Sequence, residues 1–106
     1  MGIIERLEAT LASGDDSPQI RFGLASAYFR EARFEAVREH AGIAVELDPD
    51  YSAAWRLLGR ACAEIGDMAA ARDAFEHGIV AAEQRGDFQL VKEMRVFLAR
   101  LSKNSD

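Results

Sequence analysis

Hydrophobic residues recur three or four positions apart in six segments of the chain, and short polar or glycine-containing stretches separate these segments. The first segment shows the pattern with Ile3, Ile4, Leu7 and Leu11. Residues three and four positions apart share one face of an α-helix, so each segment is predicted to be a helix with one buried side. The pattern therefore predicts an all-α domain without a sheet, in which helices exceed roughly 65% of the residues.

Turn residues set the expected helix boundaries. Gly14 ends the leading helix, and Ser17 is expected to cap the next helix, with Pro18 in its first turn. Pro49 disfavours a helical conformation at the residue before it and so separates two units. The expected division is a leading helix (residues 1–14), a first helical hairpin (18–49), a second hairpin (52–85) and a last helix (87–103).

The two central hairpins repeat each other at a fixed offset of 34 residues. Leu24 and Tyr28 of the first hairpin correspond to Leu58 and Cys62 of the second. A helical hairpin of this length has an apolar face that it cannot bury alone, so the two hairpins are expected to stack. Small residues at Gly59, Ala71 and Gly78 are expected where helices cross most closely.

The second hairpin carries a recognisable motif. It reads Trp55-x-x-Leu58-Gly59-x-x-Cys62 and then Ala71-x-x-x-Phe75, which closely resembles the tetratricopeptide repeat signature W-x-x-L-G-x-x-Y followed by A-x-x-x-F. The chain resembles a small, free-standing, bacterial type of tetratricopeptide repeat protein. This resemblance implies a right-handed α-solenoid of two helix–turn–helix repeats, with the leading and last helices capping its ends.

The chain also departs from the family pattern. Arg21 and Ala41 stand where the first repeat would have its Trp and Phe, and Glu83 stands where the second would close with Pro. The second hairpin is therefore expected to continue to Arg85 and to stop at Gly86. The resemblance covers residues 18–85.

The composition of the chain indicates which classes of partner and which cellular compartment to expect. The 106 residues form one domain, and the net charge of −5 argues against a nucleic-acid partner, which would need a cationic surface. No run of about 20 apolar residues is present, and the first residues lack the pattern of a signal peptide. With Cys62 as the single cysteine, a cytoplasmic protein away from membranes is expected.

The residues do not combine into a catalytic or metal-binding motif. His40 and His77 are far apart in the sequence and are expected to be exposed on helices. Cys62 replaces the inward-facing Tyr of the signature and is expected to be a buried structural thiol, while Trp55 is expected in the core. The sequence therefore predicts a protein that is not an enzyme and has neither a cofactor nor a metal.

A stripe beside the buried face of each repeat's first helix is the candidate binding site. It holds Arg56, Arg60 and Glu64 in the second repeat and the equivalent Phe22, Ser26 and Arg30 in the first. By resemblance, such stripes line the concave groove that receives peptides. The candidate peptide-binding residues are Phe22, Ser26, Phe29, Arg30, Arg56 and Arg60.

Arginines in a concave site bind carboxylates through paired N–H groups, so an acidic peptide is the expected ligand. In the alternative interpretation, these arginines pair with local acids such as Glu64, and Phe22 packs under Leu7 or Leu11. The sequence thus favours a non-enzymatic adaptor that binds a segment of a partner protein and is a monomer or a weak homodimer. The competing hypothesis is a homodimeric assembly module that uses the leading or the last helix.

Overall fold

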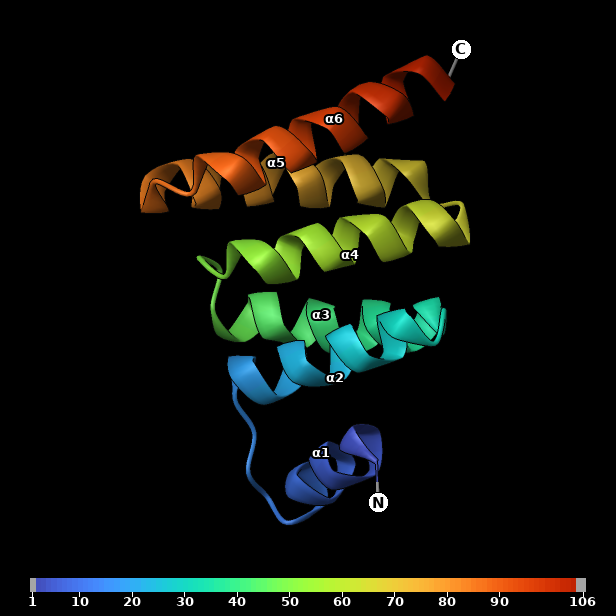
Figure 1. Ribbon diagram of the computed structural model, residues 1–106, viewed down its shortest axis with the longest axis vertical. Coiled ribbons are helices and arrows are strands. Elements are labelled where there is room, and N and C mark those ends of the chain that lie inside the picture. The colour runs from blue at the N-terminus through green and yellow to red at the C-terminus, as the bar shows by residue number, and fades with distance from the viewer. Residues whose placement is uncertain (1, 105–106) are drawn as a thin grey trace.

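The computed structural model describes residues 2–104, which form six α-helices and no strand (Figure 1). The helices are α1 (Ile3–Ala12), α2 (Pro18–Arg30), α3 (Phe34–Leu47), α4 (Ser52–Ile65), α5 (Met68–Arg85) and α6 (Phe88–Asn104). With 83% helix, the all-α prediction is confirmed. The helices stack in chain order along a body of 44 × 28 × 19 Å. Met1, the first residue of the predicted leading helix, lies outside the described residues.

The helix ends form where the turn residues predicted them. The Ser17 hydroxyl accepts a hydrogen bond from the Ile20 amide at 3.0 Å, and the Asp87 carboxylate accepts one from the Leu90 amide at 3.2 Å. Gly66 and Gly86 follow α4 and α5 with φ of 99° and 74°, in the left-handed region that glycine adopts at low cost. These contacts satisfy helix-end groups that would otherwise lack partners.

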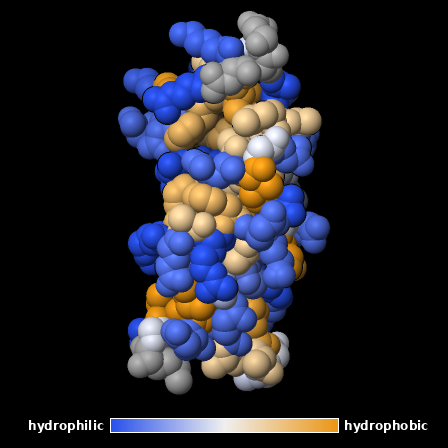
Figure 2. Space-filling model, turned by 90° about the vertical axis from the view of Figure 1, so that its right-hand side faces the viewer, coloured by the Kyte–Doolittle hydropathy of each residue, from blue (hydrophilic) through white to orange (hydrophobic). Residues whose placement is uncertain are grey.

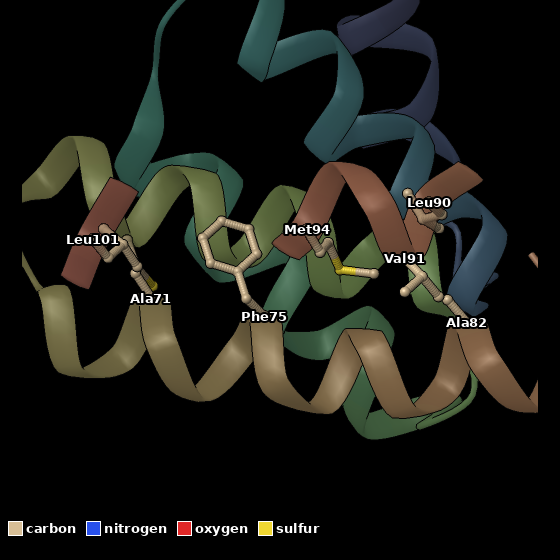
Figure 3. Packing of buried hydrophobic residues seen from close by; sticks show 8 residues of the cluster. Ala71, Phe75, Ala82, Leu90, Val91, Met94 and Leu101 are labelled. Atoms are coloured by element: carbon tan, nitrogen blue, oxygen red, sulfur yellow. The ribbon is translucent and has the colours of Figure 1, made fainter. Parts of the chain in front are cut away.

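The principal core lies between α4, α5 and α6. Side chains from α5 and α6 point toward one another there, as Figure 3 shows. Phe75 and Met94 are 1% and 0% exposed. The last helix buries Leu90, Val91 and Leu101 in the same cluster, so it covers the apolar face that α5 would otherwise leave open.

Glycines permit the close helix contacts of this core. A Cβ added at Gly59 would lie 2.6 Å from Cε1 of Phe75, and one at Gly78 would lie 2.5 Å from Sδ of Met94. Atoms of this kind cannot approach so closely without displacement of the neighbours. The predicted need for small residues at these crossings is confirmed.

The N-terminal end is held by polar contacts, and here one expectation is wrong. His40, predicted to be exposed, is buried at 6% exposure. Its ring stacks on Tyr28 with centroids 5.7 Å apart, and its Nδ1 accepts a hydrogen bond from Arg21 at 3.0 Å. The Glu8 carboxylate of α1 lies 3.5 Å from Nε2 of His40 and accepts a hydrogen bond from the Tyr28 hydroxyl. The imidazole is covered because α1 and Arg21 close over it.

Arg21, which stands at the family's Trp position, has a role of its own in this network. It binds both carboxylate oxygens of Asp16 at 2.9 Å, and this hydrogen bonding lowers the pKa of Asp16. His77, by contrast, is exposed as predicted, and its ring stacks on Trp55 with centroids 4.9 Å apart.

Contacts between helices that are not consecutive in the chain differ on the two sides of the stack. Cα atoms of α2 and α4 come within 8 Å of each other, as do those of α4 and α6, whereas those of α3 and α5 do not. The helices α2, α4 and α6 therefore lie closer to one another than α3 lies to α5, and they form one side of the stack. Within residues 2–104, no helix is both long and apolar enough to cross a bilayer.

Candidate functional site

The inner side of the stack, here called the inner face, consists of the neighbouring surfaces of α2, α4 and α6. Four of the predicted site residues come from α2 and two from α4. Figure 2 views the side of the stack at which α2, α4 and α6 end, and hydrophobic side chains lie there among hydrophilic ones. The six predicted site residues include aromatic rings and guanidinium groups, so the inner face offers both apolar surface and charge.

Arg60 occupies the centre of this surface. Its guanidinium carbon lies 4.5 Å from the ring centroid of Phe29 in α2 and 4.9 Å from that of Phe97 in α6. The Phe97 ring in turn stacks on buried Phe75, with centroids 5.5 Å apart and an angle of 8° between the rings. Such cation–π contacts attract the guanidinium and hold it over the rings, and they leave its N–H groups available for hydrogen bonds.

Arg56 is neutralised instead. Its Nη1 donates to the Glu93 carboxylate of α6 at 2.8 Å, and its Nε is buried without an acceptor among the described residues. The alternative that a groove arginine pairs with an acid is correct for Arg56, but the acid is Glu93 of α6 and not Glu64 of its own helix. This ion pair links α4 to α6 and leaves Arg56 with little charge to offer a ligand.

The remaining predicted site residues differ in what they contact. Phe22 packs on Tyr51, just before α4, at a centroid distance of 5.0 Å, and it lies against the same core cluster as Leu7 and Leu11 of the leading helix. Ser26 is half-buried, and Phe29 meets Phe34 edge to face at 5.5 Å. Arg30 is exposed at the end of α2, and within residues 2–104 no acid lies within ion-pair distance of it.

Sequence reasoning missed the contribution of α6 to the inner face. Glu93, Phe97 and Arg100 stand at i, i+4 and i+7 on this helix, a spacing that places them on one side. Phe97 also packs against the core, so one stripe of α6 both covers α5 and completes the inner face. The spacing could have identified these residues, but the last helix was expected to cap the stack or to form a homodimer, and it was not placed on the inner face.

A pocket of about 370 Å³ opens at one end of the inner face, between the last turns of α4, the first turn of α5 and the C-terminal half of α6. Arg60 and Arg100 stand at its edge, and Phe75 and Leu101 lie at its base. Within the described part of the chain, no group of three His, Cys, Asp or Glu side chains is arranged to hold a metal ion.

Cys62 is 2% exposed, and burial raises the pKa of its thiol. A higher pKa leaves less thiolate at neutral pH, and the thiolate is the reactive form. We expect the folded protein to react with a thiol reagent at least about tenfold more slowly than the same chain in denaturant. The measurement is the rate of colour release with a disulfide reagent, and equal rates would contradict a buried Cys62.

Comparisons with known proteins agree with the stacked-hairpin architecture. A family model described as "Tetratricopeptide repeat" matches residues 31–85. A TPR repeat-containing protein of Pseudomonas aeruginosa is 46% identical over 101 residues, which are 95% of this chain and 96% of the relative. A heat-shock protein cognate co-chaperone of Aspergillus fumigatus is 39% identical over 62 residues, 58% of this chain but 18% of that protein.

A solved structure shows the same arrangement of helices. The solution structure of a protein from Bordetella parapertussis superposes with a TM-score of 0.82 at 46% identity, and it covers 98% of this chain and 90% of the other. The matched repeat model, the relative aligned along nearly the whole chain and the shared fold lead to one conclusion: this chain belongs to the tetratricopeptide repeat family.

Proposed function

We propose that this protein is a non-enzymatic adaptor that holds an acidic peptide segment of a partner protein against its inner face. Proteins of this family generally mediate protein–protein interactions. The co-chaperone relative is named for work with another protein, which supports a protein partner here. The observation that carries the proposal is the guanidinium of Arg60, held between Phe29 and Phe97 and free of any acid within ion-pair distance among residues 2–104.

The orientation of Arg60 suits a carboxylate ligand. Its guanidinium carbon lies over two aromatic rings, which contain no strong hydrogen-bond acceptor, so its N–H groups can donate in pairs to a carboxylate. Arg30 at the end of α2 and Arg100 on α6 add two more cations without acidic partners in the described range. Each exposed contact contributes only about 0.2–1 kcal/mol, so selectivity requires several contacts to act together.

The experiment is an NMR titration of the labelled protein with matched acidic and basic peptides. We expect the acidic peptides to shift amides of α2, α4 and α6 and to bind more weakly as salt is raised, because salt screens exposed charges. Arg60→Gln should weaken binding more than Arg72→Gln, a matched change on α5. Arg60 is the better test than Arg56, since changing Arg56 would also break its ion pair with Glu93.

Two outcomes would contradict the adaptor proposal. Equal chemical-shift changes with acidic and basic peptides would show that the charge of the peptide does not determine binding. Shifts centred on α5 around Arg72 would place binding on the outer side of the stack. Thermal melting of both variants controls for stability, and neither is expected to change it greatly because both remove one partly exposed charge.

A second candidate is the homodimeric module. The observation in its favour is apolar surface on the terminal helices, where Phe88 and Val96 of α6 are 64% and 50% exposed and Ile3 of α1 is 45% exposed. Sedimentation over a range of protein concentrations tests it directly. A mass that rises toward twice the chain mass, and that Phe88→Ser returns to one chain, would favour this candidate over the adaptor.

A further inference from the structure

We infer that the pocket at the end of the inner face receives one aliphatic side chain of the bound peptide, next to an acidic residue that Arg60 and Arg100 hold. This inference rests on the proposed adaptor function and specifies the peptide that would bind. The pocket lies where α4 ends, α5 begins and α6 passes over both helices. Its volume of about 370 Å³ is near the lower limit of ligand pockets in proteins, roughly 300–1,000 Å³, and suits a side chain with its neighbouring backbone.

The base of the pocket is apolar. Phe75 and Leu101 are 1% and 5% exposed, so their positions are fixed by the core beneath them. Ala63 is half-buried beside them, and Met68 at the first turn of α5 is 37% exposed. An aliphatic group that enters here leaves water, and the flexible thioether of Met68 can adapt to its shape.

The edge of the pocket carries two cations that share one aromatic ring. The guanidinium carbons of Arg60 and Arg100 lie 4.9 Å and 5.7 Å from the centroid of Phe97. Within residues 2–104, neither arginine has an acidic group within ion-pair distance. Glu64 also lines the pocket, which leaves an excess of one positive charge at its edge.

This arrangement determines the chemistry of the occupant. Two cations at the edge of one pocket attract an anion, and a carboxylate accepts hydrogen bonds from a guanidinium in pairs. The carboxylate must stand beside an apolar group, because the edge is charged while the base is not. A leucine or similar aliphatic residue next to Asp or Glu has this composition, and it can belong to the same acidic segment that Arg60 attracts.

The test uses two synthetic acidic peptides that differ only in one central residue, Leu or Ala, each flanked by Glu. We expect the Leu peptide to bind about tenfold more tightly, because it buries more apolar surface. Its titration should shift the ε-methyl signal of Met68 and the amides of Ala63 and Leu101. The Ala peptide should shift the inner face but leave these signals nearly unchanged.

Protein variants distinguish the contribution of the charged edge to binding from that of the apolar base of the pocket. Arg100→Gln should weaken binding of the Leu peptide about threefold, whereas Arg95→Gln should not, since Arg95 lies on the same helix but pairs with Glu83. Ala63→Leu should fill the pocket and remove the advantage of Leu over Ala while the acidic peptide still binds. A melting curve for each variant confirms that it is folded before binding is compared.

The outcomes distinguish the two levels of the proposal. If acidic peptides bind but Leu and Ala are equivalent, or if Arg100→Gln and Arg95→Gln behave alike, the pocket inference is wrong and the adaptor function stands. If neither peptide shifts any signal, both are wrong. If decanoate shifts Met68 and Leu101 while the peptides do not, the pocket binds a free amphiphilic acid, and the peptide assignment is overturned.

Discussion

Replacing Gly59 with leucine is expected to lower the free energy of unfolding by about 3 kcal/mol or more, because even a Cβ at this position would lie 2.6–2.8 Å from three ring atoms of Phe75. The Phe75 ring cannot easily move aside, since it is buried and stacks on Phe97. For a domain of this size, such a loss corresponds to a fall in Tm of more than about 10 °C. Thermal unfolding followed by circular dichroism measures it.

The chain provides a matched control in Gly42, which is also inside a helix but has no atom within 4 Å of an added Cβ. Gly42→Ala should raise the free energy of unfolding by about 0.5–1 kcal/mol, because alanine is the better helix former. Gly59→Ala, the same chemical change, should lower it. Equal effects at the two positions would show that α4 and α5 are not packed through Gly59.

Removal of residues 87–106 is expected to abolish cooperative unfolding. The last helix buries Leu90, Val91, Met94 and Leu101. Each such side chain contributes about 1.5–3 kcal/mol on burial, and together they are comparable to the roughly 5–15 kcal/mol stability of a typical domain. The truncated chain would also expose Phe75 and should aggregate. Urea unfolding together with light scattering tests both effects.

A milder change tests the same helix without deleting it. Met94 is fully buried, so Met94→Ala should lower the free energy of unfolding by about 2–5 kcal/mol while the chain remains soluble.

The truncation has one outcome that would contradict this account of α6. A truncated protein that stays soluble and unfolds as cooperatively as the full chain would mean that α6 is available for other partners. The homodimer hypothesis would then become the stronger one.

Much of the fold could be predicted from local sequence because local chemistry decides it. Ser17 and Asp87 cap the helices that follow them, and Gly66 and Gly86 end the helices before them. These effects involve residues within one or two turns of each other. The recurrence of small residues at Gly59 and Gly78 likewise predicted close crossings, since no larger side chain would fit there.

The candidate site depended more on long-range contacts. Arg56 and Arg60 are one helical turn apart and were equivalent in the sequence, yet Arg56 pairs with Glu93 while Arg60 lies between two aromatic rings. His40 was expected at the surface but is buried because Arg21 and Glu8, far away in the chain, meet there. The periodicity within one helix shows on which face a residue lies. It does not show which residue of a neighbouring helix will contact that face.

The sequence by itself determined six helices, their ends, the stacking of two repeated hairpins and the burial of Cys62, since these follow from periodicity, capping and side-chain size. Only the tertiary structure decided which arginines keep a free charge and that α6 completes the inner face. The physical reason is the register between stacked helices, which sets Phe97 and Glu93 opposite Arg60 and Arg56. Packing of whole apolar faces fixes that register, and no short stretch of sequence specifies it.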